Sequence, residues 1–138
     1  LAHRMVEMEL LPACRAYGLG VIPWSPLAGG MLAGLEKTEA GRRVTALQRD
    51  PKTYDKHRPQ MEAYEGLCRE IGEKPADVGI AWLLNNPVVT APIIGPRTTA
   101  QLTGSLRSLE IKLSADIVKR FEQIWPGPGG EAPEVFAW

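Results

Sequence analysis

Residues 20–34, "GVIPWSPLAGGMLAG", contain the pattern that decides how the fold is interpreted. An apolar run ends in Trp24, Ser25 and Pro26 and gives way to a string of small residues. A strand that stops in a turn of small residues leaves backbone N–H groups pointing outward, which suits an anionic ligand as well as a tight loop. The turn by itself leaves both alternatives open.

The composition is that of a soluble globular protein. The 138 residues include 16 Lys+Arg and 16 Asp+Glu, and 44% of the chain is hydrophobic. We expect no nucleic-acid binding, because phosphate contacts need clustered Lys and Arg and the chain has no sustained basic block. No apolar run approaches the ~20 residues of a membrane span, and the first residues, "LAHRMVEMEL", lack a secretory signal pattern. We expect one domain, a cytoplasmic location and no membrane contact.

The cysteine and histidine spacing argues against a metal site. Cys14 and Cys68 form no CxxC pair and lie in helix-like patterns, so we expect buried free thiols. His3 and His57 are the two histidines, and neither lies in a metal-binding spacing such as HExxH.

Two short apolar segments, residues 19–24 and 88–94, predict parallel strands buried on both faces. Helical spacing predicts helices at residues 5–17, 56–71, 76–84 and 115–124, and one more through Leu102, Leu106 and Leu109. The pattern indicates an α/β fold. Two strands cannot cover their own faces and edges, so we expect part of a larger sheet and no stable monomer.

Two segments have no clear periodicity. Residues 33–54 are polar and broken by Gly41 and Pro51, which is typical of a functional flap or of a poorly ordered segment; we favour the flap. The tail, residues 125–138, has too much Pro and Gly for regular structure, and its apolar end is expected to dock on the body. Ser114 is expected to cap the helix that precedes the tail.

The motifs "GLGVIPWSPLAGGMLAG" and "PIIGPRTTAQLTGSLRSLEIKLS" together resemble the C-terminal part of the aldo-keto reductases, in the branch that includes bacterial oxidoreductases and potassium-channel β subunits. The resemblance covers essentially the whole chain and implies part of a (β/α)8 TIM barrel. Such barrels typically have ~250 residues, so residues 1–138 would be the C-terminal half of one. It implies that residues 19–24 are strand 7, residues 88–94 are strand 8, and residues 115–124 are the extra helix after the barrel.

The resemblance also implies that this chain lacks the catalytic residues. The family's tetrad of Asp, Tyr, Lys and His comes from the first half of the barrel, so no catalytic residue is assigned. Residues of the right type fall in helix or flap positions: His3, Tyr17, Tyr54 and His57.

What the resemblance assigns to this chain is a cofactor site. Trp24 would stack on the nicotinamide, and the turn that follows would wrap the pyrophosphate. The implied set is Trp24, Ser25, Pro26, Leu27, Gly30, Gly95, Arg97, Gln101 and Ser105. Ser25 would offer its hydroxyl, and Leu27 and Gly30 their N–H groups. The alternative is that Trp24 is a core residue of the barrel rim and that the glycines only form a turn.

The second motif implies NADP rather than NAD. Arg97 would contact the 2′-phosphate, for which a guanidinium ahead of a helix start is well suited; the alternative is an exposed turn arginine. Gln101 either contacts the cofactor or forms a capping box with Thr98. Ser105 stands where this branch usually has an Asn for the adenine.

The sequence departs from the family in the glycine turn as well. Where "LTGK" usually follows, residues 32–35 read "LAGL". Arg42 and Arg43 could replace the lysine, although paired charges in a polar loop are most often solvated.

The resulting hypothesis is an NADP-dependent aldo-keto reductase that reduces small-molecule aldehydes or ketones by hydride transfer. This chain would bind the cofactor and be inactive alone. Its partner would be the N-terminal half of the same barrel or another copy of the chain. The alternative is a non-enzymatic cofactor-binding or interaction subunit that resembles the channel β subunits.

Overall fold

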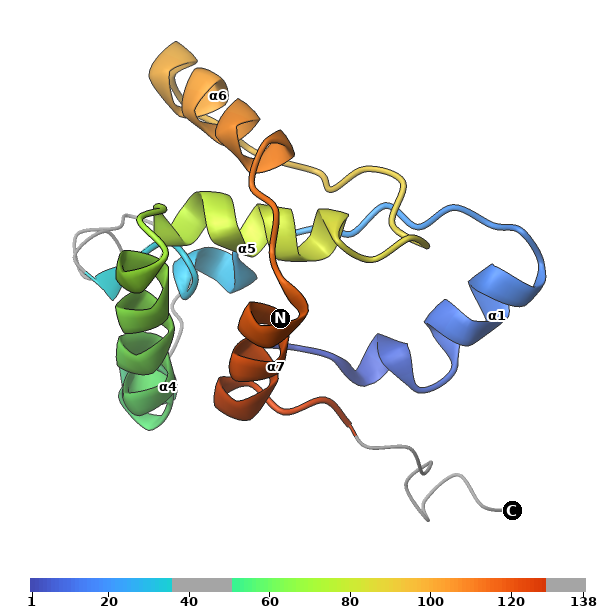
Figure 1. Ribbon diagram of the computed structural model, residues 1–138, viewed down its shortest axis with the longest axis horizontal. Helices are drawn as coiled ribbons and strands as arrows, with labels where there is room; N and C mark the ends of the chain where they lie inside the picture. The colour runs from blue at the N-terminus through green and yellow to red at the C-terminus, as the bar shows by residue number, and fades with distance from the viewer. Residues whose placement is uncertain (36–50, 129–138) are drawn as a thin grey trace.

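The computed structural model of the chain describes residues 1–35 and 51–128, with the backbone alone for residues 51–54 (Figure 1). Its helices are α1 (Leu10–Ala16), α4 (Pro51–Glu70), α5 (Pro75–Leu84), α6 (Thr99–Ser105) and α7 (Ala115–Ile124). Three 3-10 turns complete the list: η1 (Met5–Glu7), η2 (Ala28–Gly30) and η3 (Leu106–Leu109). Most of the expected flap, with Arg42 and Arg43, and the last ten residues of the tail lie outside the described residues.

The helices expected at residues 56–71, 76–84 and 115–124 are confirmed as α4, α5 and α7. Helix α4 begins at Pro51, so the flap prediction was wrong for residues 51–54. The expected helix at residues 5–17 is divided into η1 and α1, with a break at Glu9. Pro12 gives the physical reason, because it has no N–H to donate to the Met8 carbonyl of a continuous helix.

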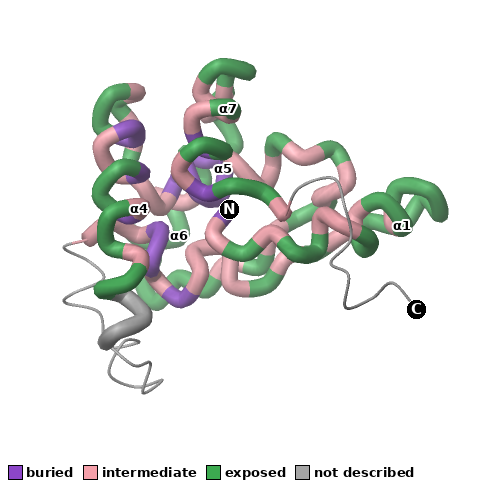
Figure 2. Tube along the Cα trace, turned by 90° about the horizontal axis from the view of Figure 1, so that it is seen from below, coloured by how far each residue is buried: buried purple, intermediate pink, exposed green. Residues whose placement is uncertain are grey.

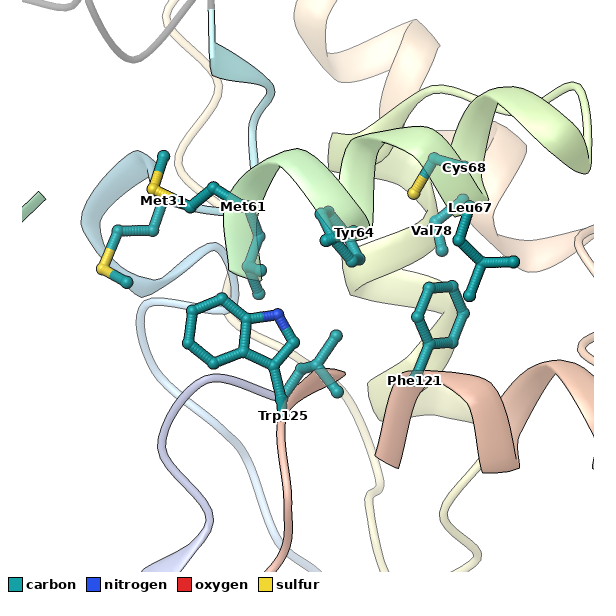
Figure 3. Close-up of a cluster of buried hydrophobic side chains, with 10 residues drawn as sticks. Met31, Met61, Tyr64, Leu67, Cys68, Val78, Phe121 and Trp125 are labelled. Carbon is teal, nitrogen blue, oxygen red and sulfur yellow. The ribbon is translucent and has the colours of Figure 1, made fainter. Parts of the chain in front are cut away.

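The core lies between α4, α5 and α7. Its buried members are Leu1, Met31, Leu32, Met61, Tyr64, Leu67, Cys68, Val78, Phe121 and Trp125. On α4 they recur every three or four residues, which places them on one face of the helix. Figure 3 shows this face of α4 meeting Phe121 and Trp125 from the other side. The rings of Tyr64 and Phe121 have centroids 5.6 Å apart.

Arg4 ties the start of the chain to this core. Its guanidinium donates to Glu7 at 2.7 Å and to the Trp125 carbonyl at 3.2 Å. It also lies 5.2 Å from the centroid of the Trp82 ring on α5. Helix α1 follows directly, but it stands at the opposite end of the molecule from α4 (Figures 1 and 2).

The two expected strands do not form regular strands in the part of the chain that the structure describes. Residues 19–24 and 88–94 instead meet at two isolated parallel bridges, Val21 to Val89 and Trp24 to Ile93. The Val21 N–H donates to Val88 O at 3.1 Å, and the Thr90 N–H donates to Val21 O at 2.9 Å. Prolines at positions 23 and 92 lack the N–H that a longer ladder would need.

The expectation that both segments are buried was wrong for this chain. Ile22 is 60% exposed and Trp24 is 79% exposed. A strand is buried only when neighbouring strands and helices cover it, and among the described residues each segment has the other as its only bridge partner. None of the described helices has the length and apolar character needed to cross a membrane.

Candidate functional site

The two turns singled out in the sequence start at the same end of the paired segments. The bridge between Trp24 and Ile93 is parallel, so the chain leaves both residues in the same direction. The Ile93 N–H donates to Pro23 O at 2.8 Å and fixes this register. The first turn follows directly at Ser25, and the second begins two residues after the bridge, at Gly95.

The first turn, residues 25–30, has an unusual backbone. Ser25 and Ala28 have φ values of 55° and 49°, and the two glycines that follow also have positive φ. The Gly29 N–H donates to Ser25 Oγ at 3.3 Å, and the Ala28 N–H donates to Ser25 O at 2.9 Å. A non-glycine residue in such a conformation costs about 1–3 kcal/mol and persists only where its surroundings hold it, which is common at ligand sites.

The sequence predicted that Leu27 and Gly30 offer their N–H groups to a ligand, and the structure gives these two residues different surroundings. The Gly30 N–H donates to Leu27 O at 2.9 Å, so it already has an acceptor inside the turn. The Leu32 N–H donates to the same carbonyl at 3.2 Å. Leu27 is half-buried and its side chain packs against the core, so it anchors the turn.

Trp24 presents most of its indole to solvent at the start of the turn. Its exposed fraction among the described residues is 79%. An exposed aromatic face beside a turn is able to stack on a planar ring. The geometry therefore suits a flat ligand that reaches from Trp24 across the first turn.

The second turn leads into α6 through a side-chain cap. Thr98 Oγ1 accepts the Gln101 N–H at 3.1 Å. The Gln101 side chain returns to the backbone as the capping alternative predicted, but it accepts the N–H of Arg97 at 2.7 Å, one residue before the cap. Ser105 Oγ donates to Gln101 O at 2.8 Å. Gln101 and Ser105 therefore hold α6 in the present structure.

Arg97 and Gly95 lie on the exposed surface of the second turn. Among the residues that the structure describes, no carboxylate forms an ion pair with Arg97. Its guanidinium is therefore accessible to an anionic group, for which planar, two-point donation is well suited. Together with the backbone N–H groups of the first turn, it offers donors of a kind that suits a phosphate group.

The described residues also bear on the metal and thiol expectations from the sequence. No group of three His, Cys, Asp or Glu side chains in residues 1–35 and 51–128 is placed to hold a metal ion. Cys14 is half-buried, so the expectation of a buried thiol was wrong there, whereas Cys68 is fully buried. Burial raises the pKa of the Cys68 thiol to about 12, which keeps it protonated and unreactive. Tyr17 ends α1 and His57 belongs to α4, and these two helices stand at opposite ends of the molecule (Figure 1).

Sequence patterns did not reveal the strain of the first turn. Glycines favour positive φ, but Ser25 and Ala28 carry no such signal. No pattern in the sequence pointed to a role for Gly79 in the site. This glycine lies on α5, next to the side chain of Leu27.

Comparisons with known proteins agree with the motifs. A sequence model described as "Aldo/keto reductase family" matches residues 1–126. The uncharacterized oxidoreductase YrpG of Bacillus subtilis (strain 168) is 53% identical over an alignment that covers 100% of this chain and 42% of that protein. The versiconal hemiacetal acetate reductase of Aspergillus parasiticus is 30% identical, with 89% of this chain and 37% of that protein covered.

A third relative has a name from a different functional class. It is a Schizosaccharomyces pombe protein named provisionally as a voltage-gated potassium channel subunit β, and it is 29% identical over 86% of this chain and 37% of its own length. The chain thus spans roughly two fifths of the length of these relatives.

Proposed function

Because this chain belongs to the aldo/keto reductase family, we propose that it is the C-terminal half of an NADP-dependent reductase barrel and carries the cofactor-binding loops. The observation that carries the proposal is the parallel bridge from Trp24 to Ile93, since it brings the two motif turns to one end of the paired segments. In barrels of this architecture the loops after strands 7 and 8 frequently form the phosphate site.

Each part of the site has a distinct task in this proposal. Trp24 stacks on the nicotinamide, the turn at residues 25–30 surrounds the pyrophosphate, and Arg97 contacts the 2′-phosphate. The Gln101 side chain either turns to the adenosine, and then gives up its hydrogen bond from the Arg97 N–H, or stays on the backbone and keeps this bond. The cofactor, when bound, supplies a hydride for the carbonyl carbon of a small aldehyde or ketone.

The rest of the barrel supplies what this chain lacks. We infer that residues 19–24 and 88–94 are strands 7 and 8 and that the N-terminal half of the barrel, or another copy of the chain, covers their exposed sides. Support comes from the length of the relatives outside the match and from the exposed Ile22 and Trp24. The proton donor for the carbonyl oxygen lies in that other half, so this chain alone turns over no substrate. We place the protein in the cytoplasm.

A second candidate is a cofactor-binding subunit without reductase activity. The similarity to the protein named as a channel β subunit favours it. Turnover of an aldehyde by the full-length protein, lost on mutation of its proton donor, would decide for the reductase.

The cofactor assignment is tested by titrating NADPH and NADH into the full-length protein by calorimetry. Arg97→Ala should weaken NADPH far more than NADH, because the charge-assisted contact to the 2′-phosphate is worth roughly 1.5–3 kcal/mol. That corresponds to about one to two powers of ten in Kd. Trp24→Ala should weaken both cofactors alike, since stacking on nicotinamide does not sense the 2′ position.

Arg15→Ala, which removes an exposed arginine on α1, is the matched control and should change neither constant. Equal losses of NADPH and NADH in the Arg97 variant would make Arg97 an ordinary turn residue and leave the NADP preference without support.

A further inference from the structure

The strained turn at residues 25–30 has to be held in place from outside. Ser25 and Ala28 both have positive φ, and the hydrogen bonds within the turn do not fix its position on the body of the protein. The contacts that do so come from apolar side chains after Pro26. Met31 and Leu32 are buried in the core, and Leu27 packs against it.

Two of these side chains, Leu27 and Leu32, approach one glycine of α5. A Cβ atom added at Gly79 would lie 3.2 Å from Tyr64 Oη, 3.3 Å from Leu27 Cδ2 and 3.5 Å from Leu32 Cβ. Gly79 is buried in the middle of a ten-residue helix, where glycine is a poor helix former. Close approach of the turn, and not helix propensity, therefore accounts for glycine at this position.

Tyr64 is the third neighbour of Gly79, and its own contacts hold it in place. It is almost fully buried on α4, and its hydroxyl donates to Pro75 O at the start of α5. Its ring also packs against Phe121 of α7. Figure 3 shows Tyr64 on the side of α4 that carries Met61 and Leu67.

We propose that Gly79 and Tyr64 are positioning residues that seat Leu27 and Leu32 and thereby hold the turn at residues 25–30 in its strained conformation. The claim that this turn binds a cofactor rests on the proposed function. The seat itself does not, because it follows from the packing of Leu27 and Leu32 on α4 and α5. A methyl group at Gly79 requires Tyr64 Oη and Leu27 Cδ2 to move by a few tenths of an ångström, and we expect the turn then to relax toward ordinary φ values.

The first test needs no ligand and uses the full-length protein. Gly79→Ala should speed hydrogen exchange of the Ala28, Gly30 and Leu32 amides about tenfold, while amides of α7 exchange as before. The matched control is Gly66→Ala on α4, where an added Cβ meets nothing within 4 Å. It should leave the turn unchanged. Shortening the displaced side chain with Leu27→Val should restore protection in the Gly79→Ala background.

Unchanged exchange of the turn in Gly79→Ala overturns the proposal. Equal acceleration in the turn and in α7 also overturns it, because the substitution then acts on global stability. Tyr64→Phe is a second variant that keeps the ring and removes the bond to Pro75 O. It should likewise accelerate the turn amides in preference to those of α7.

The second test measures NADPH and NADH affinity of the same variants. Gly79→Ala should weaken both cofactors by a similar factor of about ten, since the pyrophosphate is common to both. Gly66→Ala should weaken neither. If the unaltered protein binds neither cofactor, the proposed function fails, and the exchange experiment still decides the positioning role. If it binds them and Gly79→Ala binds equally well, the seat has no role in binding and the proposal is overturned.

Discussion

The helical core and the paired segments use the same kinds of apolar residue in opposite ways. The helical core consists of α4, α5 and α7 with the residues packed between them. The paired segments are residues 19–24 and 88–94. In the core, Phe121 and Cys68 have no exposed surface, whereas in the paired segments Ile22 and Trp24 are more than half exposed. Figure 2 shows buried residues gathered on the core helices and few along α1 and the segments beside it.

The difference shows that burial depends on the number of neighbouring elements. Helix α4 packs against both α5 and α7, so its apolar face is covered within this chain. The paired segments have two bridges to each other and no other bridge partner in the part of the chain that the structure describes. An open, apolar strand edge is a surface for further strands, which agrees with the proposal that the other half of a barrel covers it.

The largest expected difference is in the free energy of unfolding after removal of an aromatic side chain from each region. Phe121→Ala should lower the free energy of unfolding by about 3–5 kcal/mol, because it leaves a cavity between α4 and α7. Trp24→Ala should change it by no more than about 0.5 kcal/mol, since the indole is exposed. Chemical denaturation of the 138-residue chain measures both. A loss above about 2 kcal/mol for Trp24→Ala would place Trp24 in a packed core and remove the contrast.

The sequence predicted the helical core better than the paired segments, for a physical reason. Helical spacing and the Ser114 cap located α7 correctly, because a helix satisfies its backbone hydrogen bonds locally. The segments at residues 19–24 and 88–94 were predicted as buried strands from their composition. Strands need partners that are distant in sequence, and this chain supplies one bridge partner for each segment in the described residues. The composition of a segment cannot predict how many neighbouring strands it will have.

The candidate site shows the same limit. The motifs identified Trp24, the glycine turn and Arg97, and the structure brings the two turns to one end of the paired segments. The motifs did not predict the positive φ of Ser25 and Ala28, because those residues reach it through the packing of Leu27 and Leu32 on Gly79. Gln101 was predicted equally as a cap or a cofactor contact, and its side chain accepts the Arg97 N–H, one residue before the Thr98 cap.

A smaller effect is expected at the crossing of the paired segments. A Cβ atom at Gly20 would overlap Thr90 Oγ1, so Gly20→Ala should force the two segments apart at a cost of about 1–3 kcal/mol. Hydrogen exchange of the Val21 and Thr90 amides, which form the bridge, should accelerate. Gly104→Ala on α6, where a Cβ meets nothing within 4 Å, is the control and should leave the exchange of the Val21 and Thr90 amides unchanged. Unchanged exchange at Val21 would mean that the bridge does not form in solution.

The smallest effect compares the two side-chain caps. Ser114 Oγ accepts the Ile117 N–H at 3.3 Å at the start of α7, and Thr98 Oγ1 accepts the Gln101 N–H at 3.1 Å at the start of α6. Loss of such a cap typically costs about 1 kcal/mol. Ser114→Ala should lower the global free energy of unfolding by that amount, because α7 belongs to the helical core.

Thr98→Ala should leave the global value unchanged and accelerate only the exchange of α6 amides, because α6 has no buried residue and can open without the core. Thr103→Ala, at an exposed position on the same helix, controls for the change of residue type. Equal global losses for Ser114→Ala and Thr98→Ala would show that α6 and the core unfold as one cooperative unit. The paired segments would then be coupled to the core more tightly than their exposure indicates.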